Sequence, residues 1–227
     1  FFLGNDFIKN SPSLNLRYNG LSYVLETYVD LQKKYFHKFC LIDTESDDVL
    51  YWKFFKEFIY ELSLKETERM KSVFLIRCKQ HKKFNAIYQS NGSDKEDLLR
   101  HKPILFMKEE KEVFSDFENW IYKYNLFTIT SGLSIQDNMK SIIDDSVEMI
   151  CENYMESLMW TTHYYFKECI SWKWYYFFEH GPTLKDFFEY INKDEFSMSL
   201  DTEPYSSIEQ LQMVLPYKSL NLLEEVD

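Results

Sequence analysis

The chain has 227 residues, of which 45% are hydrophobic, 19% aromatic and 28% charged, so it can bury a real core as one large domain or two small ones and is not a disordered protein. Only five Gly and five Pro residues are present, fewer than the turns of a β-sandwich or barrel require, and a mainly helical fold is predicted. The formal net charge of −11 disfavours a free-standing nucleic-acid binder, because such binding depends on basic residues that neutralise phosphates.

A local basic patch is still compatible with this charge. The stretch RCKQHKKF at residues 77–84 is a candidate, although its pattern is more typical of a solvated helix face. The cysteines show no paired spacing of the zinc type, and no apolar run approaches the length of a membrane span. With no signal peptide, the thiols are expected to be reduced and the protein to lie in the cytosol or nucleus, with no membrane partner.

The first sixteen residues, FFLGNDFIKNSPSLNL, predict the end of a buried strand that runs into a loop, because Gly4 loosens the backbone and Pro12 prevents a helix. The chain opens without Met inside an apolar run, so it is expected to come from a longer protein. Asp6 follows the predicted strand, the place where open α/β sheets build ligand sites. The alternative is that Asn5 or Asp6 only caps a turn.

Helical periodicity predicts the elements that follow, over residues 21–36, 48–71 and 114–124. The stretch SNGSDKED at residues 90–97 predicts the clearest flexible loop, and TITSGLS at residues 128–134 breaks the pattern again. A long helix is predicted to begin near Asp145, which forms an acidic variant of the capping box with Glu148. This helix leads directly into the aromatic stretch SWKWYYFFEHGP, residues 171–182.

The aromatic stretch contains two tryptophans two positions apart. In an extended backbone Trp172 and Trp174 share a face, whereas in a helix they diverge by about 200°. A wall of two such rings can stack unpaired bases, and each stacked base contributes about 1–3 kcal/mol. The alternative is that these rings fill a core.

Three motifs in family order resemble the Xrn-type 5′-to-3′ exoribonucleases. Residues 1–16 resemble the family's Leu-Gly-Asn-Asp-Phe motif. The stretch YMESLMWTTHYYFKECISWKWYYFFEHGP at residues 154–182 resembles its last conserved block, in which a helix leads into a Ser-Trp-x-Trp-Tyr-Tyr run. EPYSSIEQLQMVLP, residues 203–216, resembles its Phe-Glu-Gln-Leu-x-x-Val-Leu-Pro element. The resemblance is firm at the start and from about residue 146 to residue 223, and loose between.

The chain departs from the family pattern at two places. Phe177 to Pro182 stand where the family usually reads Pro-Tyr-His-Tyr-Ala-Pro, and Lys9 and Asn10 stand where it reads Pro-His. The basic residues are mostly Lys, with only four Arg. This composition suits an AT-rich genome, such as that of a large virus or a protist.

The resemblance implies a mainly α fold: a multi-helix domain with a short strand remnant at the amino end that belongs to a missing α/β nuclease domain. Residues 1–20 are then expected to end the catalytic nuclease domain. Residues 21–227 are expected to form an Xrn-like helical domain with a flexible loop near residues 90–101. The C-terminal element is expected to be anchored to the helical core through Glu209, Gln210, Leu211 and Leu215.

The resemblance also implies an activity, the hydrolysis of 5′-monophosphorylated single-stranded RNA to mononucleotides by two Mg²⁺ or Mn²⁺ ions held by carboxylates. Asp6 matches the last of the family's acidic set and is the expected catalytic, metal-binding residue. Trp172 or Trp174 is expected to bind substrate by stacking on a base or lining the RNA channel.

The other acids and the 5′-phosphate pocket lie in the family before the Leu-Gly-Asn-Asp-Phe motif. The chain alone is therefore expected to be inactive and to need the missing N-terminal nuclease domain as its partner. The alternative function is a catalytically degenerate RNA-binding or protein-interaction module.

Overall fold

The computed structural model describes residues 1–38, 40–45, 49–72, 75–76, 79, 139–178, 181–192 and 203–219, without the side chains of Arg17 and of residues 139–146. The elements are a 3-10 helix η1 (Leu16–Tyr18) and the helices α1 (Gly20–Lys34), α2 (Trp52–Ser63), α8 (Met139–Phe166), α9 (Leu184–Ile191) and α10 (Ser207–Val214). The mainly helical class is confirmed, since within these ranges the only sheet-type pairing is by isolated bridges such as Ile42 with Leu50.

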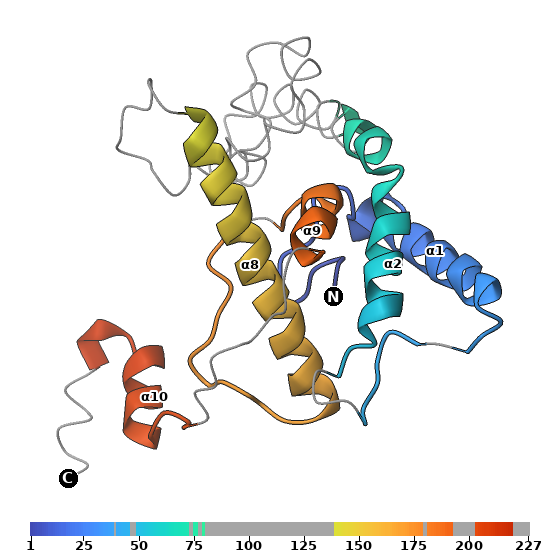
Figure 1. Ribbon diagram of the computed structural model, residues 1–227. Helices are drawn as coiled ribbons and strands as arrows, with labels where there is room; N and C mark the ends of the chain where they lie inside the picture. Colours follow the sequence, from blue (N-terminus) through green and yellow to red (C-terminus); the bar gives the residue numbers. More distant parts are fainter. Residues whose placement is uncertain are drawn as a thin grey trace.

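The core lies where α2, α8 and α9 meet, with α9 between the other two helices and α1 on the outer side of α2 (Figure 1). On α2 the predicted helical periodicity is observed as a buried row with a spacing of four residues, because Phe54, Phe58 and Leu62 are each at most 2% exposed. Burying a side chain of this size stabilises the fold by about 1.5–3 kcal/mol. The Tyr28 ring of α1 covers this row from outside, edge-on to Phe54 and Phe58.

Helix α9 holds the two longer helices together. It begins at its N-cap Thr183, whose hydroxyl accepts a hydrogen bond from the Asp186 N–H at 3.2 Å. Its buried face consists of Leu184, Phe187 and Ile191. The Phe187 ring lies 5.3 Å from Tyr154 on α8 and 6.4 Å from Phe55 on α2, so one side chain contacts both neighbours.

Helix α1 matches its prediction closely. It begins at Gly20. Only glycine fits at this position, because a side-chain Cβ would lie 2.6 Å from the Asn15 carbonyl oxygen. It ends at Lys34, after which Phe36 and His37 both adopt the left-handed conformation (φ 54° and 58°) that closes a helix.

Two helix boundaries differ from the sequence prediction. The helix predicted over residues 48–71 is divided by a turn at residues 64–65 into α2 and a shorter helical segment at residues 66–72. Helix α8 begins at Met139, so Asp145 lies inside it and the capping box predicted at Asp145 and Glu148 was wrong. No Gly or Pro interrupts the six residues before Asp145, and the helical backbone therefore continues through them.

The strand expected at the amino end is replaced by turns. The Gly4 N–H donates to the Phe1 carbonyl at 2.8 Å, and the Asn5 N–H donates to the Ile8 carbonyl at 3.0 Å. Gly4 has φ +85°, a left-handed conformation in which a side chain would be strained. The chain thus reverses direction and buries Phe2 and Ile8 in the same core as α2, α8 and α9.

The carboxyl-terminal helix α10 begins with a capping box, in which Ser206 and Glu209 bond each other's backbone N–H groups. None of its residues is buried, and Leu215 after it is not among the side chains packed on the core, so the expected anchoring through Glu209, Gln210, Leu211 and Leu215 is not observed. Over the described residues, no helix has the length and apolar character needed to cross a membrane. The loop near residues 90–101, the helix at 114–124 and the break at 128–134 lie outside those residues, as does residue range 77–84 except Lys79.

Candidate nucleic-acid site

Asp6 is exposed at the tip of the amino-terminal turn. The Asn5 side chain holds this turn, since its Oδ1 accepts hydrogen bonds from the Phe7 and Ile8 N–H groups, both at 2.9 Å. The Phe7 ring lies 5.1 Å from Trp160, which belongs to the last turns of α8. The turn is therefore fixed against α8, while Asp6 remains exposed.

Three aromatic rings form a column beside this turn. Trp160 and Tyr164, one helical turn apart on α8, are stacked at 5.0 Å with an angle of 8° between their planes. Trp174 stacks on the other face of Trp160 at 5.6 Å and 24°. The indole N–H of Trp160 donates to the Ser171 carbonyl at 2.7 Å, which fixes the ring in the column.

Residues 174–178 form an extended segment along α8, here called the aromatic ribbon. The Trp174 indole N–H donates to Glu156 at 3.2 Å, and the Phe177 backbone N–H donates to Asn153 at 3.1 Å. Asn153 also donates to Glu156 at 3.0 Å, so both anchors on α8 are held in place. The side chains alternate along the ribbon: positions 174, 176 and 178 are wholly or partly buried, and positions 175 and 177 are exposed.

A hollow of about 220 Å³ lies between the Asp6 turn and the ribbon. Its walls are Asn5, Asp6, Phe7, Ile8, Lys9, Trp160, Trp174, Tyr175 and Tyr176. It places Asp6 and Trp174, from distant parts of the sequence, in one site that also includes Lys9. The sequence contained Lys9 only as a departure from the family motif, and no local pattern indicated that Tyr175 and Tyr176 would line the same hollow as Asp6.

Trp172 does not line the hollow, and its side chain is 51% exposed. Residues 172 and 173 lie in a bend, which the hydrogen bond from the Trp174 N–H to the Ser171 hydroxyl at 3.1 Å stabilises. The two-tryptophan wall of a fully extended backbone is therefore not formed.

The described residues do not assemble a metal site by themselves. Nowhere among them do three or more His, Cys, Asp or Glu side chains converge as metal ligands do. Asp6 offers a single carboxylate, whereas Mg²⁺ is held by several oxygen ligands. A metal centre at this turn needs ligands in addition to those described.

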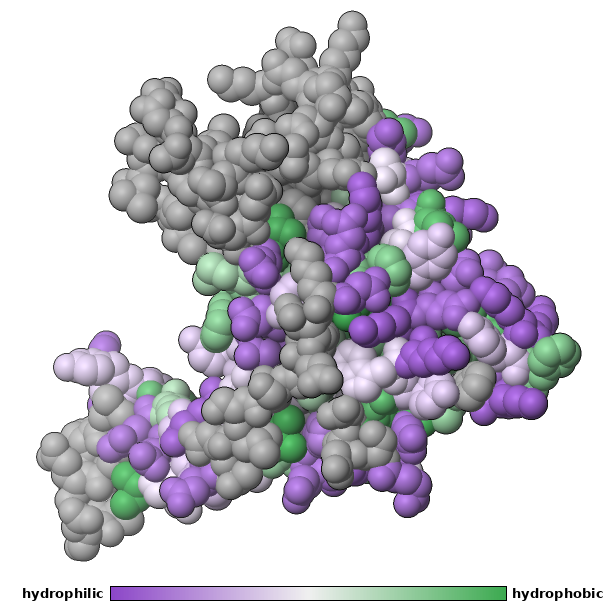
Figure 2. All heavy atoms as spheres, viewed as in Figure 1, coloured by the Kyte–Doolittle hydropathy of each residue, from purple (hydrophilic) through white to green (hydrophobic). Residues whose placement is uncertain are grey.

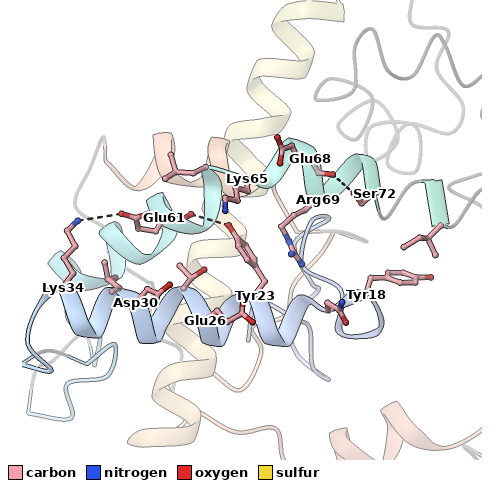
Figure 3. A pocket seen from close by; sticks show the side chains of 15 residues that line it. Tyr18, Tyr23, Glu26, Asp30, Lys34, Glu61, Lys65, Glu68, Arg69 and Ser72 are labelled. Carbon is pink, nitrogen blue, oxygen red and sulfur yellow. Dashed lines mark hydrogen bonds and ion pairs between the residues drawn. The ribbon is translucent and has the colours of Figure 1, made fainter.

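A larger groove, of about 850 Å³, lies between α1 and the α2 region and shares no residue with the hollow (Figure 3). Most of the residues that line it are polar or charged, and the surface over α1 and α2 is largely hydrophilic in Figure 2. The Arg69 guanidinium lies over the Tyr23 ring at 4.0 Å. The Tyr23 hydroxyl donates to the Leu62 carbonyl at 3.1 Å. These contacts join α1 to α2, and the groove contains none of the residues singled out from the sequence.

Comparison with known proteins identifies relatives along the chain. Residues 134–226 match the protein family described as the Xrn1 helical domain. The 5′-3′ exoribonuclease 1 of Saccharomyces cerevisiae is 31% identical over 121 residues, which cover 52% of this chain and 7% of that protein. The human 5′-3′ exoribonuclease 1 is 25% identical over 249 residues, which cover 98% of this chain and 14% of that protein.

The chicken 5′-3′ exoribonuclease 2 is 36% identical over 74 residues, a third of this chain and 8% of that protein. The chain thus spans only a small part of the length of each relative. The family match overlaps the region from residue 146 to residue 223 in which the motif resemblance is firm. The resemblance is therefore confirmed: this chain is similar to the Xrn-type 5′-to-3′ exoribonucleases, and its carboxyl-terminal part matches the family described as the Xrn1 helical domain.

Proposed function

We propose that this chain is the helical part of a 5′-to-3′ exoribonuclease that hydrolyses 5′-monophosphorylated single-stranded RNA to mononucleotides. The observation that carries the proposal is the hollow shared by Asp6 and Trp174. A carboxylate that can bind a metal ion and an aromatic ring that can stack on a base thus lie in one site, and a nucleotide can use both groups. The relatives reported above are named 5′-3′ exoribonucleases, which supports the same reaction class.

Three residues that line the hollow have proposed roles. The Trp174 ring, held by the Trp160 stack and by Glu156, offers a rigid face for a base. Lys9 offers a positive charge that can neutralise a phosphate. Asp6 offers one oxygen ligand for a divalent cation.

Two divalent cations, Mg²⁺ or Mn²⁺, would orient the attacking water and stabilise the leaving oxygen in the complete enzyme. The remaining ligands are proposed to come from the N-terminal nuclease domain, which is also the proposed partner of this helical part. The cytosol or nucleus is the proposed compartment. The eukaryotic relatives reported above lend no support to a viral origin.

The first experiment replaces Asp6 by Ala in the full-length protein and measures release of mononucleotides from 5′-monophosphorylated RNA with Mg²⁺. Loss of a metal ligand is expected to lower kcat about 100-fold or more. The matched control is Glu45→Ala, since Glu45 is an exposed carboxylate outside the hollow. Unchanged activity in Asp6→Ala would exclude the metal-ligand role.

The same assay decides between the proposal and the alternative of a catalytically degenerate module. A full-length wild-type protein that binds RNA and releases no mononucleotides is the result expected of that module. The lone carboxylate of the hollow is compatible with both functions, and only the activity of the whole protein separates them.

A further inference from the structure

Glu66 joins three segments that are far apart in the sequence. It lies in the helical segment 66–72 after α2 and is only 3% exposed. Its Oε1 accepts hydrogen bonds from the Ser13 hydroxyl at 2.9 Å and from the Leu184 N–H at 2.6 Å. Its Oε2 accepts one from the Lys185 N–H at 2.9 Å. One carboxylate thus connects the α2 region, the loop after the Asp6 turn and the first turn of α9.

The two backbone donors explain why a carboxylate is found at this buried position. Leu184 and Lys185 are the first residues of α9, and the first N–H groups of a helix have no acceptor within the helix. The positive end of the helix dipole also favours a negative charge there. The side chains of Lys65 and Glu68, by contrast, line the groove of Figure 3, so this segment presents Glu66 to the interior and its neighbours to the groove.

Further hydrogen bonds extend this connection to the Asp6 turn. The Gly181 N–H donates to the Asn10 carbonyl at 3.2 Å, and the Ser11 hydroxyl donates to the Pro182 carbonyl at 3.1 Å. The Ser11 N–H donates to the Phe2 carbonyl at 3.2 Å and so closes the base of the turn that carries Asp6. Loop 10–13 is therefore attached to the start of α9 along its length.

Loop 10–13 and the segment before α9 pack so closely that only glycine fits at position 181. A side chain there would lie 2.8 Å from the Tyr154 ring and 3.1 Å from the Asn10 carbonyl oxygen. The same segment that begins α9 follows the aromatic ribbon in the chain. Both walls of the hollow are thus connected to the set of contacts around Glu66.

We propose that Glu66 is a positioning residue, whose carboxylate fixes loop 10–13 against the start of α9 and thereby sets the position of Asp6 relative to Trp174. Glu66 does not line the hollow and acts only through the loop. The structural part of this proposal stands on the contacts alone, and its consequence for catalysis rests on the function proposed for Asp6.

The test uses the full-length protein and two substitutions that remove different contacts. In Glu66→Gln, whichever way the amide turns, one backbone N–H of α9 loses its acceptor, while in Ser13→Ala only the bond to the loop is lost. Amide hydrogen exchange over residues 4–13 is expected to become about tenfold faster in both variants. Exchange over residues 184–187 is expected to rise only in Glu66→Gln, and Glu68→Gln, an exposed carboxylate of the same segment, is the control.

Steady-state kinetics on 5′-monophosphorylated RNA with Mg²⁺ give the functional readout. A displaced Asp6 is expected to lower kcat about tenfold in both variants with little change in KM. The effect of the double variant is expected to be smaller than the sum of the two single effects, because both substitutions weaken the contact between Ser13 and Glu66.

Unchanged exchange over residues 4–13 in both variants would overturn the proposal and leave Glu66 as a cap of α9. Unchanged kcat in Ser13→Ala, with faster exchange over the loop, would overturn its catalytic consequence. If Glu66→Gln fails to fold, hydrogen exchange and kinetics of Ser13→Ala still test the proposal. If exchange responds as expected while Asp6→Ala keeps full activity, the function proposed for Asp6 fails and the positioning contact stands.

Discussion

At the scale of single residues, two opposing influences act on the pKa of the Glu66 carboxylate. Burial raises its pKa from its usual value near 4.5 to about 7, and the nearby Asp186 charge acts in the same direction. The hydrogen bonds from Leu184, Lys185 and Ser13 act in the opposite direction, because they favour the charged form. The negative charge of Glu66 in turn adds to the effect of burial, which raises the pKa of the Tyr154 hydroxyl.

This raised pKa predicts how stability depends on pH. Between about pH 4.5 and 7 the folded state holds a proton on Glu66 that the unfolded state has released. The stabilising contribution is thus complete below about pH 4.5 and is lost as the pH rises through about 7. The free energy of unfolding is expected to fall by about 1–3 kcal/mol over this range relative to Glu66→Gln, which does not titrate.

Equilibrium urea unfolding followed by tryptophan fluorescence, at pH 5 and pH 8, measures this difference. The charge of Asp186 also raises the pKa of Glu66, so Asp186→Asn serves as a control for that contribution. Parallel pH profiles for the wild type and Glu66→Gln would show that burial does not raise the pKa of Glu66.

At the scale of elements, the aromatic ribbon decides which tryptophan meets the hollow. Its alternating side chains follow the two-residue period of an extended backbone, one of the two conformations that the sequence left open. The bend at residues 172–173 removes Trp172 from that period. The bend depends on the Ser171 hydroxyl and on the stacking of Trp174 against Trp160, and the second of these contacts comes from another element.

This difference gives a prediction for RNA binding. Trp174→Ala is expected to weaken binding of a short 5′-phosphorylated single-stranded RNA about tenfold, the effect of one lost base stack. Trp172→Ala is expected to change it less than about twofold, as for an exposed ring outside the site. Fluorescence anisotropy without Mg²⁺ measures binding apart from hydrolysis, and Trp174→Phe is expected to restore most of the affinity. An equal loss in both Ala variants would contradict the assignment.

At the scale of the whole molecule, the chain covers 7–14% of the relatives reported above. Within its described part the hollow contains one carboxylate, and no group of three potential metal ligands is formed. Two-metal hydrolysis needs more ligands than this.

The chain alone, without further sequence, is therefore expected to release no mononucleotides from 5′-monophosphorylated RNA with Mg²⁺ or Mn²⁺. The assay is thin-layer or chromatographic detection of mononucleotides, with the full-length protein measured in parallel. Robust release by the chain alone that persists in Asp6→Ala would point to a catalytic centre elsewhere in it.

The sequence by itself determined the helical class and the similarity to the Xrn-type exoribonucleases. The recurrence of Phe54, Phe58 and Leu62 is a local pattern, and a helix with one apolar row must bury that row. The three motifs are likewise readable from residue order alone. The start of α8 was missed, because a local capping signal at Asp145 cannot show that the helix already continues through it.

Only the tertiary structure decided how the candidate site is assembled. Asp6 and Trp174 line one hollow, and Glu66 bonds Ser13 and the start of α9, although these residues are distant in the chain. Such contacts depend on how α9 packs between α2 and α8, which no local period specifies. The local sequence therefore determined the helices and the family resemblance of this protein. The packing of those helices decided which of its residues lie together.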